Sequence, residues 1–146
     1  MNSKRQDDLK NQIRTARDVL LDVVHQPPPT LGIDLDGCCD ESSFFNILTH
    51  VWPGDVIVVT FRRDRNKAIA DLVKYGIRYT DVVLVDTFEA KAEVIRERGI
   101  SFYIDDQPEM LKNVAANVSV MLFRNEGNFD FDDCKWMLSD KTGKLI

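Results

Sequence analysis

The stretch Leu31-Gly32-Ile33-Asp34-Leu35-Asp36-Gly37 decides the fold and marks the predicted site. Its first half is apolar, as in a buried strand, and two aspartates follow just before a glycine. Residues i and i+2 of a strand point to the same side, so Asp34 and Asp36 are expected to project together. Two such carboxylates repel each other unless a cation or a shared proton lies between them. The stretch fits a magnesium site, because Mg²⁺ prefers oxygen ligands. It equally fits an aspartate-rich turn after a strand.

Composition favours a globular domain. The chain has 146 residues, of which 44% are hydrophobic and 29% charged, and this length suffices to bury a core. A net charge of −5 argues against a protein that coats nucleic acid. No apolar run approaches the roughly 18 residues of a membrane span, and residues 1–17 are too polar for a signal peptide. The three cysteines, Cys38, Cys39 and Cys134, fit neither a disulfide framework nor a zinc motif. We therefore expect a reduced, cytoplasmic protein without a membrane partner.

Five short apolar runs alternate with segments of helical spacing. The runs are Leu31 to Leu35, Val56 to Thr60, Val82 to Val85, Phe102 to Ile104, and Val118 to Phe123. Helices are predicted between them, over residues 42–50, 65–75, 89–98 and 108–117. Alternating strands and helices predict a parallel sheet with right-handed crossovers, and continuous apolar strands fit a sheet covered on both faces. The predicted fold class is α/β, a three-layer α/β/α sandwich with a five-stranded parallel sheet.

Two further segments flank this pattern. A helix is predicted over residues 1–26, from a capping box at Ser3 to the prolines at 27–29, which end it. Its apolar residues recur every three or four positions: Leu9, Ile13, Ala16, Leu20 and Val23. This stripe either packs on or beside the core of its own chain or pairs with a second copy in a homodimer. Residues 27–146 would then form one domain, whose tail, 128–146, is predicted as a last helix or as a strand at the sheet edge.

Polar residues gather where the predicted strands end. They lie at Asp34 to Gly37, Thr60 to Arg63, Asp86 to Lys91, and Asp105 to Gln107. In an open parallel sheet, ligands bind beyond the carboxyl ends of the strands. Carboxylates, a hydroxyl, arginines and a lysine are therefore expected at one edge, and together they supply the groups that phosphoryl transfer requires.

In this order the pieces resemble the haloacid dehalogenase (HAD) superfamily of phosphohydrolases, from Leu31 to about Phe123. Asp34-Leu35-Asp36-Gly37 is similar to the first motif of that superfamily, and the strand ending at Thr60 to the second. Lys91 looks like the third motif, and the strand ending at Asp105-Asp106 like the fourth. Residues 100–111 further resemble the 5′-nucleotidase (deoxyribonucleotidase) branch.

The resemblance implies an Mg²⁺-dependent hydrolase of phosphomonoesters, with nucleotides among the candidate substrates. It implies that Asp34 is the nucleophile that forms an aspartyl-phosphate and that Asp36 is the general acid and base. Thr60 and Lys91 would bind the transferred phosphoryl group. The implied metal ligands are Asp34, the backbone carbonyl of Asp36, Asp105 and Asp106.

Two neighbouring features carry open alternatives. Arg62 and Arg63 follow Thr60 and are either the solvated start of a helix or substrate-binding residues, because arginine suits phosphate recognition. Arg62 is the first choice for such a contact. Cys38 and Cys39 are expected to be buried, inert thiols rather than a redox switch.

The intervals between the motifs are too short for a cap domain, so the resemblance implies a capless member with an open site. Such a site would be completed by a second subunit or covered by its own substrate, a phosphorylated macromolecule. A small phosphorylated substrate is the other alternative. Two rival functions stay open. One is a phosphate- or metal-binding regulatory module of the same fold without turnover, and the other is a structural protein that oligomerises through the N-terminal helix.

Overall fold

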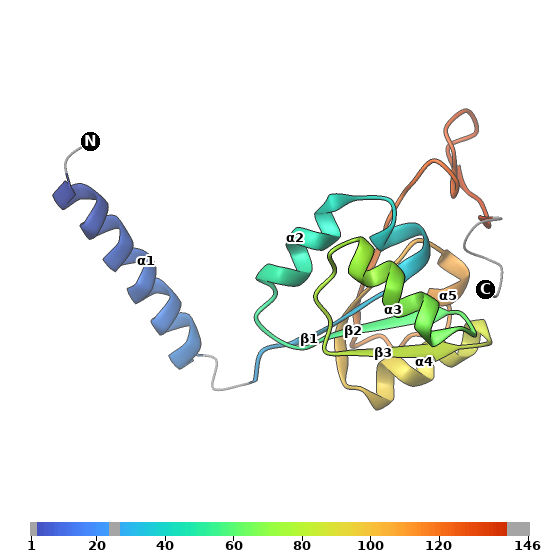
Figure 1. Cartoon of the computed structure of the whole chain (residues 1–146), viewed down its shortest axis with the longest axis horizontal. Coiled ribbons are helices and arrows are strands. Elements are labelled where there is room, and N and C mark those ends of the chain that lie inside the picture. The colour runs from blue at the N-terminus through green and yellow to red at the C-terminus, as the bar shows by residue number, and fades with distance from the viewer. Residues whose placement is uncertain (1–2, 24–26, 140–146) are drawn as a thin grey trace.

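A computed structural model describes residues 3–23 and 27–139, and its centre is a five-stranded parallel sheet (Figure 1). The strands are β1 (Thr30–Ile33), β2 (Val56–Phe61), β3 (Asp81–Val85), β4 (Ile100–Asp105) and β5 (Ser119–Leu122). Their order is β3-β2-β1-β4-β5, and every neighbouring pair is parallel. The chain therefore starts in the middle of the sheet, builds one side and then crosses to the other.

Helices cover both faces of this sheet. The helices α2 (Ser43–Val51) and α3 (Arg65–Lys74) lie on one face, and α4 (Phe88–Glu97) and α5 (Pro108–Leu111) lie on the other (Figure 1). One buried apolar cluster lies under α2 and α3 and includes Leu31, Ile33, Phe45, Val58 and Leu72. A second lies under α4 and α5 and includes Val59, Val85, Ile95, Ile100 and Tyr103. The predicted three-layer α/β/α sandwich is confirmed.

Gly32, in the middle strand, determines how the second cluster packs. A Cβ atom at Gly32 would lie 2.6 Å from the ring of Tyr103 and 2.8 Å from Ile100, closer than packed atoms approach. The missing side chain leaves the space that the Tyr103 ring fills. The Tyr103 hydroxyl thereby reaches Asp105, two residues further along β4, at 2.9 Å.

One predicted helix is shorter than expected. The pattern over residues 108–117 predicts a helix, whereas α5 ends at Leu111. Separate turns follow, in which Val114 donates to the Leu111 carbonyl and Val118 to the Ala115 carbonyl. Asn113 and Asn117 lie in this region, and asparagine is a weak helix former because its amide competes with the backbone.

The N-terminal helix, α1 (Ser3–Val23), lies apart from the sheet in Figure 1. Residues 24–26 of the predicted helix lie outside the described residues, as do the side chains of Ile13, Ala16, Leu20 and Val23. Leu9, the first residue of the predicted apolar stripe, is 56% exposed. Pairing of α1 with a second copy stays a prediction. Within residues 3–23 and 27–139, no helix is both long and apolar enough to cross a membrane.

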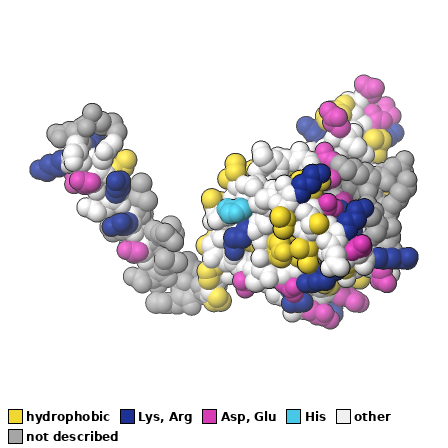
Figure 2. All heavy atoms as spheres, viewed as in Figure 1, with side chains coloured by type: hydrophobic (Ala, Val, Ile, Leu, Met, Phe, Trp, Pro, Cys, Tyr) yellow, Lys and Arg dark blue, Asp and Glu magenta, His cyan; other side chains and the backbone are white. Residues whose placement is uncertain are grey.

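The tail differs from both predicted forms. It folds into a hairpin of β6 (Phe129–Asp130) and β7 (Lys135–Trp136), which is separate from the main sheet. The turn forms because the Asp130 carboxylate accepts hydrogen bonds from the backbone of Asp132 and Asp133. Figure 2 shows acidic and hydrophobic side chains together on this hairpin at the upper right. Residues 140–146 of the predicted tail lie outside the described residues.

Candidate functional site

The predicted site residues meet at the carboxyl edge of the sheet, where the strand order reverses. Seven of them come together there and are buried: Asp34, Asp36, Thr60, Arg62, Lys91, Asp105 and Asp106. Asp34, Thr60 and Asp105 follow or end β1, β2 and β4, whereas Lys91 reaches in from α4. The parallel strands thus bring together site residues that lie up to about seventy positions apart in the sequence, as expected for such sheets.

The turn after β1 sets the direction of the two leading aspartates. Asp34 continues the sheet by donating its backbone N–H to the Ile104 carbonyl, and its side chain accepts from the backbone of Leu35 at 2.8 Å. The chain then turns at Gly37, whose φ of +86° is a left-handed conformation that favours glycine. The carboxylates of Asp34 and Asp36 have different partners, Lys91 for Asp34 and Arg62 for Asp36.

Three carboxylates form a cluster that could hold a metal ion. Asp34, Asp105 and Asp106 each offer an oxygen, and these oxygens lie within 4.8 Å of one another. All three residues are buried. An all-oxygen donor set suits Mg²⁺ better than zinc, so the residues fit the predicted cation. The backbone carbonyl of Asp36 as a fourth ligand stays a prediction.

Lys91 is the counter-charge of this cluster. Its ammonium lies 2.7 Å from Oδ2 of Asp105 and 3.1 Å from Oδ2 of Asp34, and the side chain is fully buried. Burial alone would lower the pKa of Lys91, but Asp105 and Asp34 outweigh it and raise the pKa above its usual value. Burial raises the pKa of Asp34 even beside Lys91. A cation bound beside Asp34 would favour the charged form of its carboxyl group.

Tyr103 and Gln107 fix the orientation of Asp105, and the sequence did not single out either residue for this role. The Tyr103 hydroxyl donates to Oδ2 of Asp105, and the backbone N–H of Gln107 donates to Oδ1 at 3.0 Å. Burial, followed by the charge of Asp105, raises the pKa of Tyr103, so its hydroxyl keeps its proton and remains a donor. Its place two residues before Asp105 on the same strand was the signal that could have identified it.

Asp36 does not share the cluster, because it forms a two-point ion pair with Arg62. The guanidinium donates to its two carboxylate oxygens at 2.7 and 2.5 Å, and it also contacts Asp71 on α3 at 2.7 Å. The hydrogen bonds to Asp36 raise the pKa of Arg62 despite burial, and a carboxylate held in this way is only an acceptor. Thr60 completes the group, with its hydroxyl 3.4 Å from Asp36. Arg63, the other predicted substrate-binding residue, is exposed.

Residues 123–139, here called the strap, are hydrogen-bonded to the edge of the site. Asn125 donates its amide to the Gly37 carbonyl at 2.9 Å, and Asn128 donates to the Asp106 carbonyl at 2.7 Å. The backbone N–H of Ser139 donates to the Gln107 side chain at 3.0 Å. Completion of the site by a second subunit stays a prediction. The strap follows β5, so the rule that ligand sites lie beyond strand ends could have pointed to these asparagines.

The vicinal cysteines lie behind the first aspartate and are buried, as predicted. Cys39 donates its thiol to the Asp34 carbonyl at 3.2 Å. Burial, followed by the charge of Asp34, raises the pKa of both Cys38 and Cys39 well above its usual value, which leaves little reactive thiolate at neutral pH.

Thiol labelling tests this arrangement. At pH 8, Ellman's reagent is expected to modify the exposed Cys134 rapidly and the other two cysteines only after unfolding in guanidinium, because they are buried and protonated. A Cys134→Ser variant should accordingly show almost no fast phase. Rapid labelling of two or more thiols in the folded protein would contradict the described packing.

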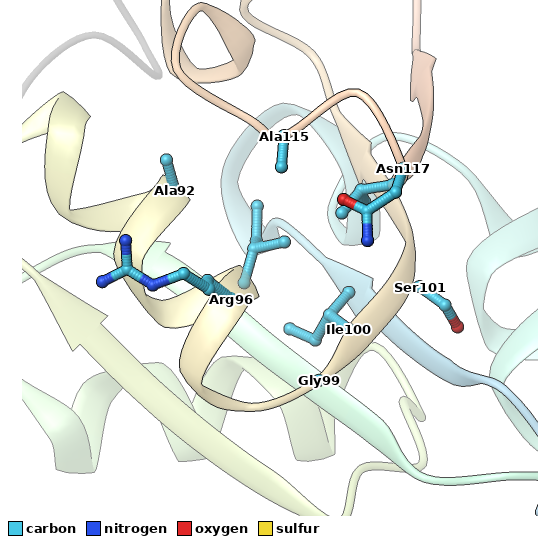
Figure 3. A pocket seen from close by; sticks show the side chains of 9 residues that line it. Ala92, Arg96, Gly99, Ile100, Ser101, Ala115 and Asn117 are labelled. Carbon is cyan, nitrogen blue, oxygen red and sulfur yellow. The ribbon is translucent and has the colours of Figure 1, made fainter.

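A separate cavity of about 200 Å³ lies at the opposite edge of the sheet, at the start of β4 (Figure 3). Ile100, Ala115 and Asn117 line it, and Arg96 points away from the other labelled side chains. None of the predicted site residues lines this cavity. It is therefore distinct from the carboxylate cluster.

Comparisons with known proteins give few matches. No family model matches the chain, and no curated protein matches it. A solved structure that does match is a crystal structure of a universal stress protein in complex with cAMP. It is 10% identical, with a TM-score of 0.42, and the match covers 66% of this chain and 98% of that one.

These findings overturn the predicted membership of the HAD superfamily and of its 5′-nucleotidase branch. No HAD family model matches, and the matching structure is a universal stress protein. The predicted phosphomonoester hydrolase, with its aspartyl-phosphate intermediate, is corrected on the same ground. In the structure, the carboxyl group of Asp36 pairs with Arg62.

Proposed function

We propose that this chain binds a divalent cation, Mg²⁺ in the cell, together with a small phosphate-bearing ligand, as a regulatory module without turnover. The observation that carries the proposal is the cluster of Asp34, Asp105 and Asp106, whose oxygens converge within 4.8 Å in a buried place. Buried charges are costly unless they are paired. The ammonium of Lys91 contacts two of the three carboxylates, those of Asp34 and Asp105, so a cation of charge two would compensate the remaining negative charge of an ionised cluster.

The phosphate-bearing ligand is proposed from the cationic and hydroxyl groups at the same strand ends. Lys91 is a compact charge that suits phosphate, and the Thr60 hydroxyl lies on the neighbouring strand end. A divalent cation would bridge the carboxylates to phosphate oxygens, as Mg²⁺ commonly does. A nucleotide is one ligand of this chemistry. Because Thr60 and Lys91 are fully buried, contact with such a ligand requires a local rearrangement at this edge.

Thermal unfolding with and without Mg²⁺ tests the proposal. Mg²⁺ should raise the melting temperature of the wild type, since a ligand at about a hundred times its Kd adds roughly 2.7 kcal/mol of stability. Asp106→Asn should lose most of this effect, because it removes one ligand charge. The matched control is Asp86→Asn, an exposed carboxylate that also follows a strand, and it should keep the full shift.

Turnover is measured in the same preparations. Wild type and Asp34→Asn are expected to release phosphate from p-nitrophenyl phosphate and AMP at the same background rate. Binding of inorganic phosphate, AMP and cAMP in the presence of Mg²⁺ is followed by calorimetry. A wild type that Mg²⁺ does not stabilise, or that hydrolyses these esters faster than Asp34→Asn, would contradict the proposal.

A further inference from the structure

We infer that Lys91 makes cation binding and anion binding at this site mutually dependent, an inference that rests on the proposed function. The ammonium contacts Oδ2 of Asp34 and Oδ2 of Asp105, so it occupies two of the carboxylates that would ligate the cation. Lys91 is therefore an internal competitor of the metal ion.

The competition arises at Oδ2 of Asp105. An ionised carboxylate offers about four acceptor positions, and three donors already use those of Asp105. They are the ammonium of Lys91, the hydroxyl of Tyr103 and the backbone N–H of Gln107. A metal ion bound through Oδ2 must displace one of the two donors on that oxygen.

Of those two donors, Lys91 is the one that can move. The Tyr103 ring is fixed on β4, where it fills the space beside Gly32 and packs in the second apolar cluster. The ammonium of Lys91 ends a flexible four-carbon stem on α4, so rotations of its own side chain can carry it away from Asp105.

A displaced ammonium is a buried charge that needs a new partner. A phosphate group held by the cation provides that partner, because it brings negative charge to the ammonium. The anion thus removes the obstacle to cation binding, and by linkage the cation strengthens anion binding by the same factor. Neither ligand alone satisfies both the three carboxylates and Lys91.

The experiment measures the affinity for Mn²⁺, by the EPR signal of the free ion, without and with saturating inorganic phosphate. Values are corrected for Mn²⁺ complexed by phosphate in the buffer. In the wild type, phosphate is expected to increase the Mn²⁺ affinity by about 5-fold or more, the usual lower range of such coupling. Lys91→Met should bind Mn²⁺ more tightly than the wild type without phosphate, and phosphate should no longer change its affinity.

Two more variants make the result specific. Lys67→Met, which removes an exposed lysine of α3, should keep the wild-type coupling. Tyr103→Phe frees one acceptor position of Asp105 and leaves Lys91 intact, so the factor by which phosphate changes its Mn²⁺ affinity should fall towards 1. This variant also serves as the test if Lys91→Met does not fold. Wild type that binds Mn²⁺ and phosphate independently would overturn the inference and leave the proposed function standing. Wild type that binds no Mn²⁺ would overturn the proposed function itself.

Discussion

Replacing Lys91 with methionine is expected to lower the free energy of unfolding of the metal-free protein by roughly 3–5 kcal/mol, the range for breaking a buried ion pair from one side. The methionine fills a similar volume, so the loss comes from charge. Asp34 and Asp105 lose the ammonium that contacts both of them, and their mutual repulsion is then uncompensated. Urea denaturation in the presence of a chelator, at pH 7.5, measures the change.

The pH dependence of this variant has a definite sign. Burial already raises the pKa of Asp34, and loss of Lys91 removes the positive charge that lowers it. A carboxyl group whose pKa is raised on folding costs stability above its unfolded pKa, near 3.8, so the variant should regain stability as the pH falls towards that value. Lys135→Met is the matched control, because Lys135 also pairs with an aspartate, at 2.9 Å, but is 61% exposed. Its effect should stay within about 1 kcal/mol; equal losses in the two variants would refute the assigned role of Lys91.

Replacing Phe45 with alanine is expected to lower the free energy of unfolding by roughly 3–5 kcal/mol, the range for deleting a buried aromatic ring. Phe45 is fully buried on α2 and meets Phe123 edge to face, with ring centroids 4.9 Å apart. Phe123 begins the strap, so the cavity left by the Phe45 ring would also loosen the strap. Urea denaturation measures the loss, and faster labelling of Cys38 and Cys39 would report the loosening.

The neighbouring residue provides the control for this second prediction. Phe44 lies on the same helix, one position earlier, but is 48% exposed. Phe44→Ala should cost about 1 kcal/mol or less, because little apolar area returns to water. A Phe44→Ala variant as unstable as Phe45→Ala would show that α2 packs by a different face.

The sheet was predictable from the sequence because its strands are marked by local signals. Leu31 to Leu35 and Val56 to Thr60 are apolar runs with polar ends, and buried parallel strands need that composition. The gathering of Asp34, Thr60, Lys91 and Asp105 followed from the same rule, since parallel strands end at one edge.

The partners of individual side chains were not predictable in the same way. The pair of Asp36 with Arg62 joins residues that are 26 positions apart in the sequence. The strap depends on single amides, those of Asn125 and Asn128, which reach backbone carbonyls that lie far away in the sequence or on another strand end. Such contacts leave no periodic pattern in a sequence, unlike strands and helices.

The resemblance to a phosphohydrolase family was wrong for a related reason. Each of its motifs is one or two polar residues at a strand end. Such short motifs can occur in two proteins because they share the geometry of a fold as well as because they share a function. The same aspartates and lysine serve a binding site equally well. Function must be argued from the arrangement of the site. Here Asp36 pairs with Arg62, and the strap is hydrogen-bonded to the edge of the site.

The central position of β1 has a consequence for how the chain folds. β1 pairs with β2 on one side, where Leu31 lies beside Val56, and with β4 on the other, where Leu31 lies beside Phe102. During synthesis β1, β2 and β3 leave the ribosome first and can form half a sheet, with one edge of β1 exposed until β4 follows. Contacts so distant along the chain form slowly, and an open apolar edge invites association. We expect β4 docking to limit the folding rate, so that the proposed metal site, which needs Asp105, forms late.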